Sequence, residues 1–491
     1  MVRNRPATLA LTGVLAALSC SPGAPAYAHD SRTFAFVGVH VVPMNGEGPL
    51  TDHTVVIEGD QIVRIGPRRE LELASDVDAI LATGRYLLPG LADMHTHVQP
   101  SSASEVEAQL LLYLATGITT LRNMVGSQAH LELKQRLIDG EVLGPRLFTV
   151  SPLLEGEDAV WPFAEKVLTP AEAEPLVAAY AAQDYEAIKI YHTLSGEVYE
   201  SVIEAARAHG IPVVGHVPFD IGVERALRAG QYSIEHLRGY DIEGVSSQVL
   251  HAEGGRSAER FASWLAMSDE RIQELARATA QAGVWNCPTI IVNDMLANLD
   301  ELTRLADHPL AGYLPPQLRT RMVDNPLVPL FSPEARAMLG RVKPQQLKFV
   351  RALHDAGAGL LVGTDTVVPF LVPGFTVIEE ITNFVQAGLT THEAIAAATV
   401  EAARFHGVLD SSGTVEVGKR ADLILLDANP LDDVANLRAL SGVVVGGRWL
   451  SKADLQSALD RLAASYAAGD KTAGSSEPGC GDQPSPCPSA Q

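Results

Sequence analysis

The chain has 491 residues, of which 46% are hydrophobic and 20% charged, so it carries ample material for a buried core. This length suits one large domain with a smaller one beside it, and with four cysteines disulfide bonds do not build the fold. The formal net charge of −22 argues against nucleic acid and anionic membranes as partners, because binding to either needs basic patches.

The N-terminus has the pattern of a secretion signal. Two arginines precede an apolar stretch over residues 7–18, and a small-x-small pattern follows at residues 26–28. We predict a signal peptide over residues 1–28, with export to the periplasm or the exterior. The apolar stretch is too short for a resident membrane span. Cleavage before Cys20, which would give an anchored lipoprotein, is the alternative.

Both ends of the mature chain have the texture of β-structure. Residues 33–87 form short apolar runs broken by turns, and residues 54–63 read as strand, Gly-Asp turn and strand, a hairpin pattern. A similar texture returns near the C-terminus. We therefore predict one small β-sandwich domain built from residues 29–87 and residues 406–452.

The chain then ends in a predicted helix over residues 453–468 and a tail over residues 469–491. The tail is rich in Gly, Ser and Pro, which predicts disorder. Cys480 and Cys487 in this tail could pair in an oxidising compartment or could stay unpaired.

The middle of the chain alternates strand-length apolar runs with helical patterns, which is the rhythm of a parallel α/β sheet. The expected strands cover residues 87–95, 117–123, 146–151, 186–191, 211–216, 231–236, 283–290 and 358–364. Expected helices cover residues 104–115, 171–183, 196–208, 344–356 and 390–404. Eight such units predict an α/β fold, a (β/α)₈ TIM-type barrel over residues 88–405.

Two stretches of this region are longer than a barrel connection requires. They cover residues 241–282 and residues 294–343. Long excursions after late strands fall on the face where barrel active sites lie. We interpret both as lid or wall insertions, with plain helical packing as the alternative.

A metal-binding pattern begins at the end of the first barrel strand, which runs into His95 and His97. Side chains alternate along a strand, so both imidazoles point the same way. Two adjacent imidazoles supply half of a tetrahedral or octahedral metal site. Alone, this pair would more often be two surface histidines.

Three further strands also end in side chains that bind metals. These are His216, His236 and Asp365. Each residue alone would more often be structural. Because the carboxyl ends of barrel strands meet on one face, their combination predicts a metal site there.

Lys189 lies between two isoleucines on a strand that should be buried. A buried lysine needs a partner or a changed charge state. Carbamylation by CO₂ would turn the amine into a carboxylate-like group able to bridge two cations. An ordinary lysine paired with an acid is the alternative.

The order of these six residues on successive strand ends resembles the amidohydrolase superfamily, in its binuclear, carboxylated-lysine form. The segments over residues 89–97 and residues 414–427 are similar to its entry and closing motifs, and the resemblance covers residues 33–452. Imidazolonepropionase-like enzymes, Xaa-Pro dipeptidase-like (prolidase-like) enzymes and ochratoxin-hydrolysing amidohydrolases are the relatives suggested. The run that follows the lysine, over residues 191–195, departs from the Gly-rich run of those dipeptidases.

The resemblance implies two divalent metal ions, with zinc favoured by the imidazole-rich ligands. His95, His97 and Asp365 would hold one metal and His216 and His236 the other, with carbamylated Lys189 as the bridge. A hydroxide shared by the two metals would attack the substrate's carbonyl group. Asp365 would take its proton and pass it to the leaving amine.

Four residues near the strand ends are candidate substrate contacts. Tyr191 shares the inward face with Lys189 and could donate a hydrogen bond to the tetrahedral intermediate. Arg238 and Tyr240 follow His236 and could hold a substrate carboxylate, and Arg122 is a similar placement. A salt bridge from Arg238 to a nearby acid, Asp241 or Glu243, is the competing interpretation.

These features predict a secreted hydrolase that cleaves a carbon–nitrogen bond of a dipeptide, an N-acyl amino acid or a related small substrate. The same hydroxide could instead hydrolyse an ester, a lactone or a phosphotriester. A protein that binds metal without turnover is the alternative from another class, and the acid at the last strand end speaks against it. We expect a small-molecule or short-peptide substrate, no nucleic acid and no membrane span, and a homo-oligomer is possible.

Overall fold

The computed structural model describes residues 33–99, 102–252, 254–298, 309–323, 328–366 and 371–473. The predicted signal peptide, including Cys20, lies outside these ranges. The tail cysteines Cys480 and Cys487 also lie outside, as do parts of the second predicted insertion. Export and the state of the tail cysteines therefore stay predictions.

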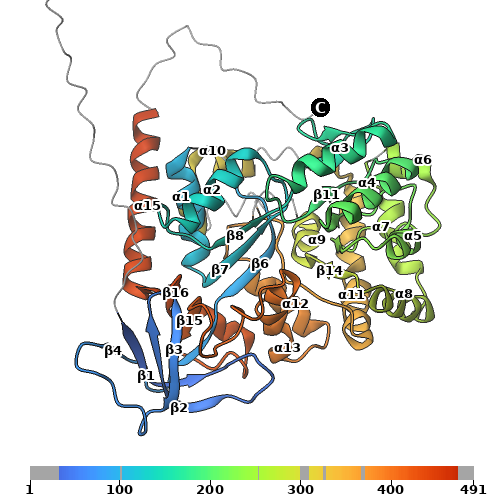
Figure 1. Ribbon diagram of the computed structural model, residues 1–491. Coiled ribbons are helices and arrows are strands. Elements are labelled where there is room, and N and C mark those ends of the chain that lie inside the picture. Colours follow the sequence, from blue (N-terminus) through green and yellow to red (C-terminus); the bar gives the residue numbers. More distant parts are fainter. Residues whose placement is uncertain are drawn as a thin grey trace, which may run out of the picture.

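Strands from both ends of the chain join in one eight-stranded sheet, at the lower left of Figure 1. Its order is β17-β16-β15-β5-β1-β2-β3, and β4 pairs with β1. The strands are β1 (Phe34–Val41), β2 (Leu50–Glu58), β3 (Gln61–Pro67), β4 (Asp78–Leu81), β5 (Tyr86–Pro89), β15 (Leu423–Leu426), β16 (Leu440–Val445) and β17 (Arg448–Ser451). The expected hairpin is the antiparallel pair β2–β3. A two-layer sandwich is not confirmed, because these strands form a single sheet.

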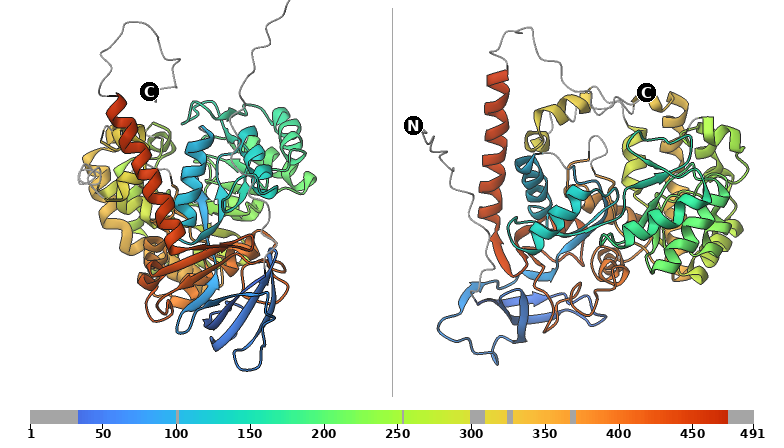
Figure 2. Two further views of the ribbon diagram at one scale, coloured as in Figure 1. Left: turned by 90° about the vertical axis from the view of Figure 1, so that its left-hand side faces the viewer. Right: turned by 45° about the horizontal axis from the view of Figure 1, so that its top comes forward.

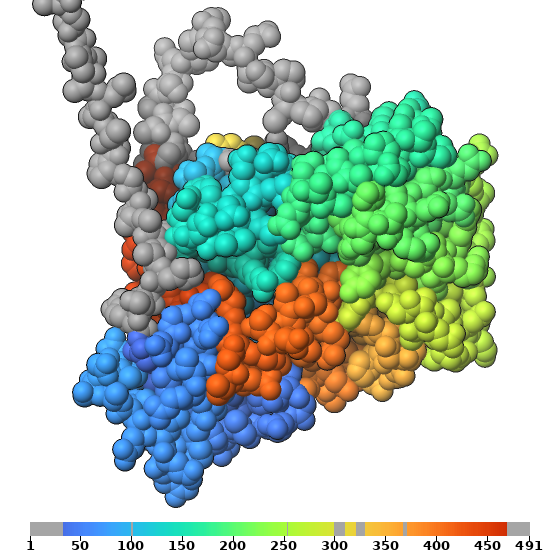
Figure 3. Space-filling model, in the orientation of Figure 1, coloured from blue at the N-terminus to red at the C-terminus, as the bar shows by residue number. Residues whose placement is uncertain are grey.

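The two ends meet where β5 pairs antiparallel with β15, with Leu88 opposite Ile424. Apolar side chains of β1, β2, β5 and β15 are buried together on this sheet, which holds the ends of the chain in place. In Figure 3 segments from the two ends, coloured blue and orange, lie side by side on the lower face. Because β5 leads almost directly into the first parallel strand, the sheet is attached to the larger α/β unit.

The larger unit is α/β and TIM-barrel-like, with two parallel sheets. One has the order β6-β7-β8 and the other β10-β9-β11-β12-β13-β14. Their strands are β6 (Leu91–Thr96), β7 (Ile118–Asn123), β8 (Arg146–Thr149), β9 (Leu153–Glu155), β10 (Glu165–Lys166), β11 (Ile188–Ile190), β12 (Val213–Gly215), β13 (Ser233–Glu235) and β14 (Trp285–Cys287). Seven of the eight expected strands are therefore present, in shorter form.

The eighth expected strand, over residues 358–364, is not a strand. It makes isolated parallel bridges, from Leu360 to Asn286 of β14 and from Thr366 to Thr96 of β6. Backbone hydrogen bonds also link the end of β8 to the residues before β11, of 2.9 Å from Glu186 to Thr149 and of 2.8 Å from Ser151 to Ala187. The structure therefore corrects the predicted barrel: in the described ranges the parallel strands form two sheets that a few backbone hydrogen bonds connect, and not one closed sheet.

Helices cover the parallel sheets (Figures 1 and 2). They include α1 (Ala103–Leu114), α2 (Gln128–Ile138), α3 (Pro170–Ala181), α4 (Gly196–His209), α5 (Val223–Ala229), α8 (Asp269–Ala282), α12 (Val377–Gln386), α13 (Thr391–Ala396) and α14 (Val400–Phe405). Local sequence sets their limits: α1 begins with a capping box at Ser102 and Glu105, and α4 ends at the left-handed Gly210. The predicted helix over residues 390–404 is two helices, because residues 397–399 leave the helical path.

The two predicted insertions are mostly helical. They contain α6 (Ser247–Ala252), α7 (Ala258–Ala266), α9 (Ile290–Ala297), η2 (Pro309–Tyr313), α10 (Pro316–Val323), η3 (Val328–Leu330) and α11 (Pro333–Ala356). The helix α11 includes the helix that was expected over residues 344–356. It packs against α7, α8 and α9. Because α8 also contacts α5, the second half of the stretch 241–282 belongs to the helical layer rather than to a separate excursion.

The chain's last described element is α15 (Lys452–Ala473), the long red helix of Figure 2, which follows β17 and the short η4 (Val434–Arg438). It contacts α1 and η2. It extends beyond the expected end at residue 468, so residues 469–473 are helical and not disordered as predicted. Among the described helices none is both long and apolar enough to cross a bilayer.

Candidate metal centre and active site

One carboxylate joins two histidines from the first parallel strand. His95 lies in β6, and His97 follows its last residue. Asp365 Oδ1 is 2.8 Å from His97 Nε2 and 3.3 Å from His95 Nε2. The three residues therefore present their donor atoms to one point, as the predicted first metal site requires.

The second pair of predicted ligands adjoins this group. His216 follows β12 and His236 follows β13. The His236 ring centroid lies 4.4 Å from that of His95 and 4.9 Å from that of His216, and its Nε2 is 3.9 Å from Asp365 Oδ2. Five of the six predicted ligands are thus brought together at the ends of parallel strands.

Lys189, the sixth, is at the centre of β11 and is 1% exposed. Burial lowers the pKa of its ammonium group to about 8, although the carboxylates of Glu235 and Asp365 oppose that change. A substantial fraction of the amine is therefore neutral close to physiological pH. This is the form that can react with CO₂.

The electrostatics favour the protonation states that metal ligands need. Burial opposes ionisation of Asp365, but the imidazoles of His236 and His95 outweigh it and hold the pKa of its carboxyl well below the usual value. Burial lowers the pKa of His216 and of His236 well below the ordinary range for histidine. At neutral pH Asp365 is therefore an ionised carboxylate, and His216 and His236 are neutral imidazoles.

Two glycines allow the ligand-bearing segments to approach closely. A Cβ atom on Gly215, just before His216, would lie 2.2 Å from the Ile190 carbonyl oxygen. A Cβ on Gly363, two residues before Asp365, would lie 2.5 Å from Cys287 Sγ and 2.8 Å from His95 Cβ. Any larger residue at either place would push the neighbouring ligand strand away.

Backbone strain accompanies two of the ligands. His236 has φ 57° and Asp365 φ 59°, in the left-handed region that non-glycine residues avoid. His236 is held by a hydrogen bond of 2.5 Å between its Nδ1 and Thr289 Oγ1. The turns aim both side chains inward from the strand ends, and such strain is typical of functional sites.

A buried ion pair beneath the site was not predicted from the sequence. Glu235 Oε2 lies 2.8 Å from His95 Nδ1, which leaves His95 Nε2 facing Asp365. Arg122 donates two hydrogen bonds to Glu235, of 2.9 and 2.8 Å, and both side chains are almost completely buried. Arg122 therefore supports a ligand rather than contacting substrate. The Ile-Glu-His sequence of the strand end was the available signal for Glu235.

A second supporting group surrounds His216. Its Nδ1 lies 2.7 Å from His192 Nε2, and its ring stacks on Tyr191 with centroids 4.0 Å apart. Trp161 Nε1 donates a 3.2 Å hydrogen bond to the Tyr191 hydroxyl oxygen. Tyr191 therefore lies beside the ligands as predicted. Trp161 has no sequence pattern that would have identified it, because the loop after β9 sets its place.

Arg238 and Tyr240, the two candidate carboxylate contacts that follow β13, lie in different surroundings. Arg238 has two enclosed nitrogens, Nε and Nη1, that make no hydrogen bond within the described ranges. Its proposed acid partners are engaged elsewhere: Asp241 Oδ2 lies 2.9 Å from Arg260 Nε, and Glu243 accepts a 2.8 Å hydrogen bond from Arg271. Burial raises the pKa of the Asp241 carboxyl, but the charge of Arg238 nonetheless lowers it, which supports an electrostatic interaction with Asp241, whereas Glu243 pairs with Arg271.

The expected position of Tyr240 at the mouth is wrong. Its side chain is 1% exposed, and its ring packs 4.6 Å from that of Phe349 on α11. Its hydroxyl oxygen lies 2.9 Å from Thr279 Oγ1. The left-handed backbone after β13 turns this side chain into the helical core, which a simple count from His236 could not foresee.

The observed donor set fits a transition-metal ion. Donor atoms of His95, His97 and Asp365 all lie within 4.8 Å of one another. Imidazole nitrogens with a carboxylate oxygen are the donors that zinc and similar divalent ions prefer. The residues therefore suit the metal that the resemblance implies.

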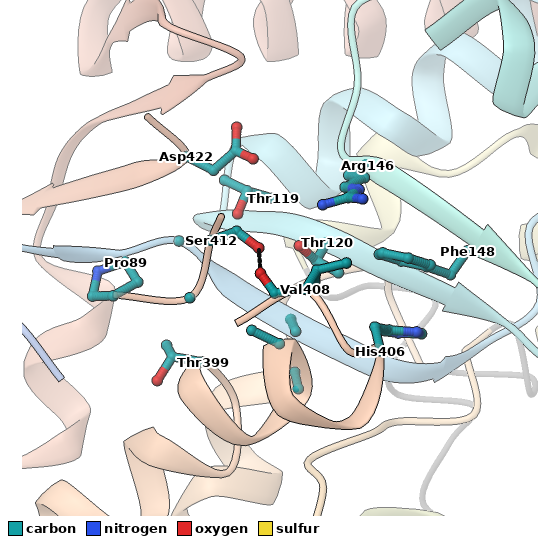
Figure 4. A pocket seen from close by; sticks show the side chains of 15 residues that line it. Pro89, Thr119, Thr120, Arg146, Phe148, Thr399, His406, Val408, Ser412 and Asp422 are labelled. Carbon is teal, nitrogen blue, oxygen red and sulfur yellow. Dashed lines mark hydrogen bonds between the residues drawn. The ribbon is translucent and has the colours of Figure 1, made fainter. Parts of the chain in front are cut away.

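A small pocket lies at the opposite ends of the strands (Figure 4). Its lining includes Pro89, before β6, Thr119 near the start of β7 and Arg146 at the start of β8. No candidate ligand lines it. It is therefore separate from the site described above.

Sequence comparison identifies relatives of this chain. The amidohydrolase family matches residues 86–450. The imidazolonepropionase of Rhizobium meliloti (strain 1021) is 28% identical over 393 residues, covering 77% of this chain and 86% of that protein. A 5-methylthioadenosine/S-adenosylhomocysteine deaminase of Bacillus cereus (strain ATCC 10987 / NRS 248) is 23% identical over 455 residues, covering 84% and 92%.

Solved structures with the same fold include peptide-cleaving enzymes. A Bifidobacterium longum protein assigned as a prolidase has a TM-score of 0.65 at 25% identity, covering 88% of this chain and 99% of that one. An Xaa-Pro dipeptidase with bound methionine has a TM-score of 0.62 at 20% identity, covering 85% and 100%. The ochratoxinase of A. niger has a TM-score of 0.60 at 19% identity, covering 86% and 96%. The predicted family resemblance is confirmed.

Proposed function

Because this chain belongs to the amidohydrolase family and is a hydrolase of carbon–nitrogen bonds, we propose that it cleaves an amide bond of a dipeptide, an N-acyl amino acid or a related small molecule. One observation carries the proposal: Asp365 meets two imidazoles of the first parallel strand, with the other predicted ligands beside it. The likeness to a dipeptidase fold supports a short peptide-like substrate.

We assign two divalent ions, zinc by preference, to the six ligands. His95, His97 and Asp365 would hold one, and His216 and His236 the other. Lys189 would bridge them as a carbamate, formed when its neutral amine bonds to the carbon of CO₂ and releases a proton. Bound cations there would make a water molecule more acidic and polarise the substrate's carbonyl group.

Asp365 and Tyr191 supply the proton chemistry. Asp365 is ionised at neutral pH, so it can accept a proton from the attacking water and deliver it to the nitrogen of the departing amine. Tyr191 accepts a hydrogen bond from Trp161, so its own hydroxyl hydrogen remains available for the oxyanion that develops on the substrate. Burial raises the pKa of Tyr191, which keeps this donor protonated.

Arg238 would orient the substrate. Two enclosed nitrogens of its guanidinium lack hydrogen-bond partners in the described part of the chain. A carboxylate next to the scissile amide could accept hydrogen bonds from them and hold the carbonyl group toward the metal ligands. Dipeptides and N-acyl amino acids carry such a group.

We also propose that the protein is exported, by cleavage of the signal peptide after Ala28. N-terminal sequencing of the mature protein should then begin at His29. A lipid-modified Cys20 at the N-terminus would favour the lipoprotein alternative.

A hydrolysis screen tests the reaction. The zinc-loaded protein is given dipeptides, N-acyl amino acids, esters and lactones, and the matched variant Asp365→Asn serves as the control. Release of amine by the parent protein and loss of that release in the variant support the proposal. Turnover of esters or lactones alone would change the proposed substrate class from amides to esters or lactones. If none of the compounds is hydrolysed although metal is bound, a metal-binding protein without turnover is favoured.

A further inference from the structure

Two aromatic side chains of one loop continue outward from the site. The loop joins β9 to β10 over residues 156–164 and carries Trp161 and Phe163. Trp161 Nε1 donates a 3.2 Å hydrogen bond to the hydroxyl oxygen of Tyr191, whose ring stacks on the ligand His216 with centroids 4.0 Å apart. The ring of Phe163 stacks in turn on the indole of Trp161, with centroids 5.7 Å apart and an angle of 21° between the planes. A series of contacting aromatic groups therefore runs from a predicted metal ligand to the outside of the molecule.

The outer end of this series is exposed although it is apolar. The Phe163 side chain is 57% exposed, and in the described ranges it is the one aromatic side chain among the exposed large hydrophobic ones. Trp161 is itself only partly buried. Covering these rings with another apolar group removes their surface from water, which is favourable. Because the rings adjoin Tyr191, which is expected to face the oxyanion, a group of the substrate is the occupant that this surface suits.

A buried carboxylate holds the loop that carries both rings. Glu155 is 0% exposed. Its Oε2 accepts hydrogen bonds from the backbone nitrogens of Val160, at 2.6 Å, and of Trp161, at 3.3 Å. Its Oε1 accepts a 3.3 Å hydrogen bond from the Thr193 hydroxyl group, in the segment after β11. Hydrogen bonds to an ionised acceptor are stronger than neutral ones, so the backbone of Trp161 is fixed before any ligand arrives.

The loop is also packed between two other segments. A Cβ atom on Gly156 would lie 2.1 Å from the carbonyl oxygen of Thr193, so the base of the loop touches the segment after β11. On another side, a Cβ atom on Gly254, in the first predicted insertion, would lie 3.9 Å from Val160 Cγ2. A ligand would therefore meet rings already in place, which lowers the entropy lost on binding.

We propose that Trp161 and Phe163 form an apolar subsite that binds an aromatic group of the substrate by stacking and apolar contact. This inference rests on the proposed function, because it assigns part of the substrate of that same site. Trp161 supplies the surface next to the Tyr191 hydroxyl group, and Phe163 extends it outward. The enzyme would then select amides that carry an aromatic group, either on the amino acid or on the acyl side of the scissile bond.

Ligand binding tests the subsite without turnover. The zinc-loaded full chain with Asp365→Asn is titrated calorimetrically with N-acetylglycine, N-acetylphenylalanine and N-benzoylglycine. Each ligand has a single carboxylate, so they differ in the aromatic group and in the side of the amide on which it stands. Trp161→Ala and Phe163→Ala each remove one ring, and Trp161→Phe keeps a ring without the indole N–H group. Ile138→Ala, at the last residue of α2, is the matched control, because Ile138 is 58% exposed.

We expect at least one of the two aromatic ligands to bind about tenfold or more tightly than N-acetylglycine. Trp161→Ala should remove most of this preference, and Phe163→Ala should reduce it about threefold or more. Trp161→Phe should retain most of the preference, because a stacking ring remains. Ile138→Ala should leave the binding of all three ligands unchanged.

The subsite is overturned if neither aromatic ligand is preferred over N-acetylglycine, or if the preference survives unchanged in Trp161→Ala or in Phe163→Ala. Because Phe163 is exposed, its variant should fold normally, and its result stands even if Trp161→Ala fails to fold. A changed oligomeric state of Phe163→Ala in sedimentation, with unchanged ligand binding, would assign this ring to a contact between copies and also overturn the subsite. Selective aromatic binding with no amine released by the parent enzyme would retain the subsite and refute the proposed reaction. Amine release without any aromatic preference would do the reverse.

Discussion

Replacing Arg122 by methionine should leave the Glu235 carboxylate buried without its main cation. Glu235 is 0% exposed and Arg122 1% exposed, so water cannot replace the two hydrogen bonds that join them. Burial disfavours the Glu235 anion, and Arg122 is the strongest of the groups that nonetheless hold its pKa well below the usual value. Removing one partner of such a pair costs about 3–5 kcal/mol of unfolding free energy.

A double-mutant cycle measures how much of this loss is the unpaired charge. Arg122→Met, Glu235→Leu and the double variant are unfolded in urea at pH 7. Because the double variant leaves neither charge of this pair buried without its partner, it should be more stable than the sum of the single losses predicts, by about 2–3 kcal/mol. Arg225→Met is the control, since its pair with Glu200 is exposed and should contribute at most about 1 kcal/mol.

The pH dependence of the unfolding free energy of these variants gives a second test of the unpaired charge. In Arg122→Met, burial should raise the pKa of Glu235 above its unfolded value, so a protonated Glu235 would need no cation. The loss caused by Arg122→Met should therefore be smaller at pH 5 than at pH 7. Additive losses in the cycle, with the same penalty at both pH values, would refute the role assigned to this ion pair.

Two further predictions concern other buried groups. Lys189→Ala should lower the bound metal, measured by elemental analysis, from two ions per chain and abolish most activity; retention of two ions would remove the bridging role. Glu380 accepts hydrogen bonds from Ile290 and Ile291 at the start of α9, and burial raises its pKa to about 7. Because this value lies above the unfolded one, its contribution is present at low pH and is lost as pH rises through 7, by up to about 3 kcal/mol. Glu380→Gln should therefore flatten the fall in unfolding free energy between pH 5 and pH 8.5, and an unchanged slope would contradict this.

Strand-end residues were predictable from the sequence because their positions follow from periodicity. His216 ends an apolar run, and His236 ends another, so the parallel arrangement alone places them on one face. Asp365 was found in the same way, although its segment makes only isolated bridges. A prediction from strand ends depends on the direction in which the chain runs, and it holds even where regular ladder hydrogen bonds are missing.

Residues beyond the strand ends were not predictable in the same way. Tyr240 was expected at the mouth, but the left-handed backbone of His236 and Leu237 turns it into the core. Trp161 reaches the site from the loop after β9, whose path depends on tertiary packing. Arg122 was expected to contact substrate, but its guanidinium pairs with Glu235, which no local pattern indicates.

The central claim, that six converging ligands hold two metals used for amide hydrolysis, is tested most directly by a metal titration. The protein is stripped with a chelator, and zinc is returned in steps while amine release from the best substrate of the screen is measured. The account predicts no activity without metal and a maximum near two ions per chain. Full activity in the stripped protein, or a maximum at one ion, would contradict it.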